Sequence, residues 1–232
     1  MLNVAHHLRQ VTLKDSNQHA TTDQKSVDPL QIQKLKAVMQ CTTATLKDVF
    51  VDCLFCEQCF AVHTSSCSGV FKQCSPDVTH CVAGLENNTL GNDTILTVFK
   101  GCLNPFQKAA CSREFSIKTS VASFWSSRTC CDSDFCNAGD LQVPAVDEIP
   151  NGFTCEDCFT DQPVDECTVT GELQCSGKQN TCANFSGTVA RPGKVGRQYS
   201  AKGCTTRDFC KLGVFNMEGS QVFNYSLKCS PA

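Results

Sequence analysis

Cysteines are the residues whose number and spacing best suit chemistry, and there are 20 of them among 232 residues. Two residues separate Cys53 from Cys56 and Cys56 from Cys59, and two also separate Cys155 from Cys158. This is the spacing of zinc ligands and, within a βαβ unit, of a redox motif. The many other cysteines and the low number of histidines, five in all, argue against a zinc site. The missing βαβ pattern argues against the redox motif. We therefore expect no metal and no cofactor.

Nucleophilic catalysis would need a serine or cysteine beside a histidine base and an orienting acid. Beyond residue 52 the only histidines are His63 and His80, and the second half of the chain has none. Neighbouring acids, as at Glu156 and Asp157, lack the spacing of a calcium loop. We therefore expect a protein that is not an enzyme.

The composition narrows the class of protein further. The cysteine density is typical of small secreted domains that rely on disulfides rather than on a large apolar core. A formal net charge of −3 leaves no basic excess for binding phosphates, which argues against a nucleic-acid partner. No run of eighteen apolar residues is present, so we expect no membrane-spanning helix.

The cysteines after Cys53 form an internal repeat. Eight cysteines from Cys56 to Cys130 are separated by 3, 8, 7, 7, 21, 9 and 19 positions, and eight from Cys155 to Cys229 by 3, 9, 8, 7, 22, 6 and 19. The triplet Lys-Gly-Cys ending at Cys102 recurs at Cys204. Such agreement indicates two copies of one module. The first copy continues with Cys131 and Cys136, which have no counterpart in the second.

The repeat divides the chain into four segments. We expect a disordered leader at 1–52, a first domain at 53–137, a linker at 138–152 and a second domain at 153–232. The long intervals between cysteines carry β-branched and alternating residues, as in Thr94–Phe99 and Val222–Leu227, and no long helical period is present. The predicted fold class is therefore all-β and disulfide-rich.

The leader does not match the rest of the chain. It is polar, has the single cysteine Cys41, and lacks the basic turn and apolar run of a secretory signal. Either the true start is missing, or the leader is a genuine non-standard extension. Cys41 and Cys53 remain outside the repeat. They pair with each other if the leader is retained; otherwise Cys53 is a capped thiol or cross-links a dimer.

The pattern C-x2-C, three more cysteines, a long interval and then C…C-C-x4-C-N resembles the three-finger fold of the lymphocyte-antigen and urokinase-receptor superfamily. Asn137 matches the asparagine that follows the last cysteine in that family. Spacing alone leaves the connectivity open, since eight cysteines allow 105 pairings. The resemblance implies Cys56–Cys81, Cys59–Cys67, Cys74–Cys102, Cys111–Cys130, Cys131–Cys136, Cys155–Cys182, Cys158–Cys167, Cys175–Cys204 and Cys210–Cys229.

Two modules, a linker ending in Pro150-Asn151-Gly152-Phe153 and the paired Lys-Gly-Cys triplets look like two groups of two-domain secreted proteins. These are the gamma-type phospholipase A2 inhibitors and the amphibian sodefrin precursor-like factors, which are courtship pheromones. The segment 52–60 looks especially like the pheromone group. The resemblance implies a secreted protein that binds an extracellular protein, either a sensory receptor or a secreted phospholipase A2. Since only three residues follow Cys229, we expect no lipid anchor.

Two kinds of surface site can be proposed from the sequence. Four sequons, at Asn87, Asn92, Asn184 and Asn224, predict N-glycosylation of a secreted chain. The segment 191–197 predicts an exposed basic tip carrying Arg191, Lys194 and Arg197, which would steer an acidic partner. Trp125 is the other candidate for partner binding, because tryptophan is favoured at binding hot spots; the alternative is that it lies in the core.

Overall fold

The computed structural model describes residues 54–141, 145–214 and 217–232. The leader at 1–52, both cysteines outside the repeat (Cys41 and Cys53) and part of the expected linker lie outside the described residues. No helix among the described residues is long and apolar enough to cross a membrane.

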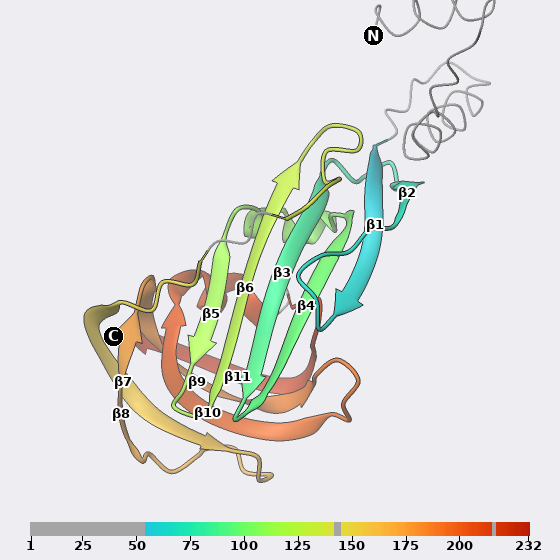
Figure 1. The fold of residues 1–232 in the computed structure, drawn as a ribbon. Coiled ribbons are helices and arrows are strands. Elements are labelled where there is room, and N and C mark those ends of the chain that lie inside the picture. Colours follow the sequence, from blue (N-terminus) through green and yellow to red (C-terminus); the bar gives the residue numbers. More distant parts are fainter. Residues whose placement is uncertain (1–53, 142–144, 215–216) are drawn as a thin grey trace, which may run out of the picture. The chain divides into compact units, whose positions relative to one another are not determined.

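The first module is an antiparallel sheet built from three hairpin-like fingers (Figure 1). Its strands run in the order β2-β1-β4-β3-β6-β5. The long central hairpin keeps full register from Cys81 opposite Cys102 to Leu90 opposite Asp93. The elements are β1 (Phe55–Val62), β2 (Val70–Gln73), β3 (Cys81–Leu90), β4 (Asp93–Cys102), the 3₁₀ helix η1 (Pro105–Ala110), β5 (Glu114–Lys118) and β6 (Ala122–Cys131).

The second module repeats this plan with one strand fewer. Strand β10 pairs with β7 on one side and β9 on the other, and β9 pairs with β11. The elements are β7 (Pro150–Thr160), β8 (Gly171–Ser176), β9 (Gln179–Ala190), β10 (Arg197–Thr206), the helical turn η2 (Phe209–Gly213) and β11 (Gln221–Pro231). The prediction of an all-β, disulfide-rich fold with two tandem modules is confirmed.

The sheets of the two modules are continuous with each other. Strand β10 of the second module pairs antiparallel with β5 of the first, with Cys204 opposite Lys118 and Thr205 opposite Ile117 (Figure 1). Gly203 permits this approach, because a Cβ atom there would overlap the carbonyl oxygen of Lys118. Gly101, at the same place in the first module, has nothing within 4 Å of such an atom. Gly203 is therefore needed for the junction, whereas Gly101, at the same place in the triplet, is not.

Nine disulfides hold the described residues, five in the first module and four in the second. They join the same pairs that the family resemblance implies. The pairs are Cys56–Cys81, Cys59–Cys67, Cys74–Cys102, Cys111–Cys130, Cys131–Cys136, Cys155–Cys182, Cys158–Cys167, Cys175–Cys204 and Cys210–Cys229.

Asn137 closes the first module beside the last of its bridges. Its Oδ1 accepts a hydrogen bond from the backbone N–H of Glu57 at 2.9 Å. Its Nδ2 donates to the carbonyl oxygens of Glu57 and Val82, both at 3.0 Å. This buried side chain therefore ties the end of the module to both β1 and β3.

Candidate functional site

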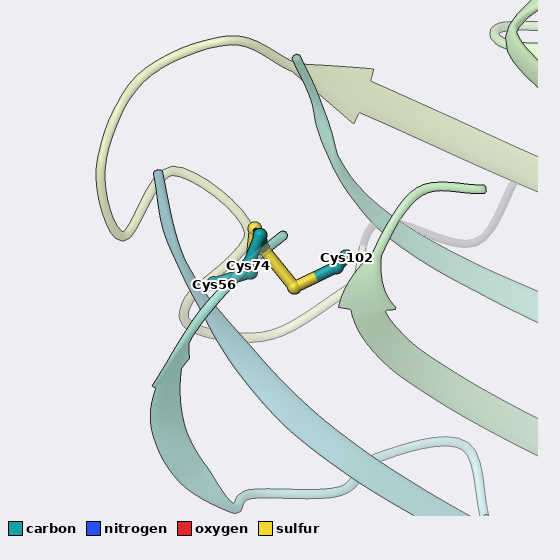
Figure 2. Close-up of side chains that lie close together, drawn as sticks. All are labelled: Cys56, Cys74 and Cys102. Carbon is teal, nitrogen blue, oxygen red and sulfur yellow. A yellow bond between two sulfur atoms is a disulfide. The ribbon is translucent and has the colours of Figure 1, made fainter. Parts of the chain in front are cut away.

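Three sulfur atoms converge in the disulfide knot of each module. Cys56, Cys74 and Cys102 form one cluster, in which the sulfurs of Cys56 and Cys74 are 3.2 Å apart. Figure 2 shows Cys56 beside the Cys74–Cys102 bridge. Cys155, Cys175 and Cys204 repeat the arrangement. Every one of these sulfurs belongs to a disulfide, and a metal ligand would have to be a thiolate. The convergence therefore serves cross-linking.

The two histidines of the described chain do not form a nucleophilic site. His80 hydrogen-bonds through Nδ1 to the hydroxyl of its exposed sequence neighbour Thr79 at 2.7 Å. His63 lies where the chain leaves β1, with a positive φ of 60° and its backbone N–H bonded to the carbonyl oxygen of Leu96. Within the part of the chain that the structure describes, neither arrangement contains the orienting acid that a catalytic base needs.

A shared apolar cluster joins the two modules. Phe115 and Phe124 of the first module pack with Phe209 of the second, and Leu212, Met217 and Leu227 pack around them. Phe124 and Phe209 have ring centroids 6.1 Å apart. The modules therefore bury part of their apolar surface against each other, which stabilises the junction through the hydrophobic effect.

Hydrogen bonds also join β5 to the second module. The hydroxyl of Thr205 donates to the carbonyl oxygen of Ser116 at 2.7 Å. The backbone N–H of Ser116 donates to the hydroxyl of Thr206 at 3.2 Å, and the side-chain amide of Gln179 donates to the Ser116 hydroxyl at 3.1 Å. Because these partners are buried, the bonds are costly to break without replacement.

Glu86 makes a further contact between the modules. This β3 side chain is only 2% exposed. Its two carboxylate oxygens accept hydrogen bonds from the backbone N–H groups of Glu218 at 2.8 Å and Gly219 at 2.7 Å, which precede β11. The nearest guanidinium nitrogen of Arg128 lies 3.9 Å away. A carboxyl group of the first module therefore binds a backbone turn of the second.

Burial dominates the electrostatics of this contact. Desolvation raises the pKa of Glu86 from 4.5 to about 7, against the opposing effects of the Glu218 and Gly219 N–H groups and of Arg128. Desolvation also lowers the pKa of Arg128. The Arg128 guanidinium lies over two aromatic rings, 5.4 Å from the centroid of Phe99 and 5.8 Å from that of Phe115. Cation–π contacts of this kind partly compensate for lost hydration.

Arg191 corrects one prediction made from the sequence. We expected it on an exposed tip, but it is 7% exposed. Its guanidinium bonds to the Asp93 carboxylate at 3.1 Å, the Asp93 carbonyl oxygen at 2.7 Å and the Asn88 carbonyl oxygen at 2.9 Å. The turn-like sequence around Pro192 predicts that Arg191 is exposed to solvent, but the β3–β4 turn of the first module covers this side chain.

The other two basic residues of the segment remain exposed. The side chain of Lys194 is 56% exposed and that of Arg197 is 69% exposed. Val195, between them, is 87% exposed. Their ionic partners, Asp93 at 3.5 Å and Asp161 at 4.0 Å, are also exposed. We call Lys194, Val195 and Arg197 the β9–β10 tip.

Trp125 lies in the core, which is the second of the two alternatives that the sequence leaves open. It was a candidate for partner binding, yet it is 6% exposed and packs with Leu85 and Val98. Its position opposite Asn87 in the β3–β6 pairing places it within the sheet of the first module. Of the four sequon asparagines, Asn92 and Asn224 are exposed, whereas Asn87 and Asn184 are half-buried.

The sequence reasoning missed the residues that join the modules. Glu86, Arg128 and Gly219 are separated by up to 133 positions along the chain, and no local pattern marks them. The one usable signal is that Glu86 is the single charged residue in the segment 81–90.

Comparison with known proteins finds a partial sequence match and a solved structure that resemble this chain. A match to Protein RoBo-1 of Rattus norvegicus is 32% identical over 83 residues, which are 36% of this chain and 32% of RoBo-1. The chain thus matches about a third of the length of that relative. The crystal structure of mouse TEX101 covers 77% of this chain and 98% of its own, with 16% identity and a TM-score of 0.34.

The u-PAR/Ly-6 domain family matches the chain twice, at residues 53–139 and 151–231. These ranges hold both sets of repeated cysteines and both disulfide knots. The chain therefore belongs to the u-PAR/Ly-6 domain family, whose domains are generally non-catalytic modules that bind extracellular protein partners.

Proposed function

We propose that this protein is a secreted extracellular signal of the sodefrin precursor-like kind, which acts by binding a sensory receptor. The observation that carries the proposal is the β9–β10 tip. Val195 is 87% exposed between two exposed cationic side chains. An exposed apolar residue flanked by positive charges suits an acidic protein surface with an apolar patch.

The neighbouring surfaces support this choice of binding site. The facing surfaces of the modules are occupied by their mutual contacts around Phe124 and Glu86. Arg191 holds the base of the tip against the first module, so the tip extends from a fixed support. The exposed ion pairs of Lys194 and Arg197 contribute little stability, and both cations can therefore exchange their partners for those of a receptor.

The second candidate is a soluble inhibitor of secreted phospholipase A2. It is supported by the linker ending in Pro150-Asn151-Gly152-Phe153 and the paired Lys-Gly-Cys triplets, which resemble gamma-type inhibitors as well as sodefrin precursor-like factors. The tip would then cover an acidic surface of the enzyme. Both candidates require protein binding without catalysis, so they differ only in the partner.

The experiment uses the full, oxidised chain secreted behind a working signal peptide. Calcium responses of amphibian chemosensory neurons are recorded against protein concentration, and a panel of secreted phospholipases A2 is assayed with the same samples. We expect a saturable neuronal response and no inhibition. Lys194→Glu combined with Arg197→Glu should raise the half-maximal concentration about tenfold, because both the steering and the contact charges are reversed.

The matched control reverses two exposed lysines outside the tip, Lys108 and Lys211, and should leave the response unchanged. Absence of any response from correctly oxidised protein would contradict the signalling proposal. Stoichiometric phospholipase inhibition that is lost in the tip variant would replace it with the inhibitor proposal.

A further inference from the structure

An apolar cavity of about 110 Å³ lies between the two modules. The first module contributes Leu90, Ile117 and Phe124 to its wall, and the second contributes Phe185, Tyr199 and Val222. Most of the lining residues are apolar, and the polar ones are Asn88, Thr89, Thr119, Ser123 and Arg191. An apolar cavity of about 150 Å³ stays free of water and takes up benzene, so the smaller space here suits a molecule of about four to six non-hydrogen atoms.

Among the described residues, Arg191 is the one charged side chain that lines this cavity. Its two terminal nitrogens are bonded to Asp93 and to the carbonyl oxygen of Asn88. Its third nitrogen, Nε, is buried and has no hydrogen-bond partner among the described residues. A buried donor without an acceptor is unfavourable, and an acceptor oxygen carried by a ligand would remove that cost.

The charge around Arg191 indicates what kind of acceptor fits. The carboxylate of Asp93 already pairs with the guanidinium at 3.1 Å. A ligand carboxylate would add a further charge against an apolar wall, which is costly. A neutral carbonyl oxygen accepts one hydrogen bond and adds no net charge.

We propose that this cavity binds a small neutral molecule with an apolar body and a single carbonyl oxygen, such as a short aliphatic ketone or ester. The apolar body fills the space between Phe124 and Phe185, and the oxygen accepts the Nε–H of Arg191. The site is separate from the β9–β10 tip, so the protein would carry a small molecule in addition to binding a protein partner.

The test is a titration of the full, oxidised chain, labelled with ¹³C at its methyl groups, followed by NMR. Two probes are used: 2-butanone, which has the acceptor, and benzene, which does not. We expect saturable shifts of the Ile117 and Val222 methyl signals with both probes, and none at the exposed Val146 and Val164. Absence of saturable shifts with either probe would overturn the cavity as a binding site.

Two variants separate the parts of the proposal. Ala201→Leu fills the cavity that Ala201 lines and should abolish binding of both probes, whereas Ala109→Leu, at an exposed position, should not. Arg191→Lys keeps the positive charge but removes the Nε donor. It should weaken 2-butanone binding about three- to tenfold and leave benzene binding unchanged.

Each of the remaining outcomes contradicts one part of the proposal. Binding that persists in a folded Ala201→Leu protein would show that the probes bind elsewhere. If Ala201→Leu fails to fold, Arg191→Lys still provides the test, because equal weakening of both probes would rule out Nε as the donor. Binding of benzene without binding of 2-butanone would overturn the carbonyl class.

Discussion

Glu86 is the side chain at which the junction between the modules depends on pH. In the unfolded chain its carboxyl group titrates near 4.5, while burial raises the folded pKa to about 7. The folded state therefore binds more protons than the unfolded state between these two values. It follows that the Glu86 contribution to stability is fully present below pH 4.5 and is lost as the pH rises through 7.

Raising the pH from 4.5 to 8 should lower the free energy of unfolding by about 3 kcal/mol, since one pKa unit corresponds to about 1.4 kcal/mol. Glu86→Gln cannot titrate and should remove this fall. Guanidinium unfolding at the two pH values measures both effects. Glu218→Gln is the control, because Glu218 lies beside the contact but is exposed, and it should retain most of the dependence. Equal falls in wild type and Glu86→Gln would refute the assignment.

Asn137 gives a second prediction at this scale. Asn137→Ala leaves the N–H of Glu57 and the carbonyl oxygens of Glu57 and Val82 without their buried partner. We expect a loss of about 2–4 kcal/mol in the free energy of unfolding. Asn104→Ala is the comparison, because exposed Asn104 makes a single capping bond to the Phe106 N–H and should cost about 1 kcal/mol or less. Similar losses in the two variants would contradict the closing role of Asn137.

At the scale of the strands, the β5–β10 pairing is the feature that converts two modules into one sheet. The repeated Lys-Gly-Cys triplet provides an internal comparison, because only Gly203 abuts the neighbouring strand. Gly203→Ala places a methyl group against the Lys118 carbonyl oxygen and should cost about 1–3 kcal/mol or more. It should also speed amide hydrogen exchange in β5 and β10.

Gly101→Ala is the matched change in the first module, where a Cβ atom meets nothing within 4 Å. It should change stability by less than about 0.5 kcal/mol. If both variants lose the same stability, or if Gly203→Ala leaves exchange in β5 unchanged, the two modules are not joined through these strands.

The strands could be predicted from the sequence, whereas the junction could not. The cysteine repeat and the alternation in segments such as Val222–Leu227 are local signals. Which face of a hairpin another module covers depends on residues such as Phe124 and Phe209, which are far apart in the chain. For the same reason the sequence predicts an exposed Arg191 and leaves Trp125 open between surface and core, although Asp93 and Leu85 bury them.

At the scale of the whole molecule, the disulfides have to compensate for small apolar cores. The buried clusters hold three or four residues each. A bridge that closes a loop of about 20 residues contributes roughly 3 kcal/mol by restricting the unfolded chain. Six of the nine bridges are separated by 19 to 29 positions, so cross-linking is the main source of stability in both modules.

The most direct test of this account is the far-ultraviolet circular dichroism of the full chain in excess reductant, compared with the oxidised protein in the same buffer. We predict that reduction abolishes the β-sheet signal at 25 °C, because neither module retains enough buried apolar surface to fold without its bridges. A β-sheet spectrum that persists after complete reduction, verified by alkylation of all the cysteines, would contradict the disulfide-dependent fold.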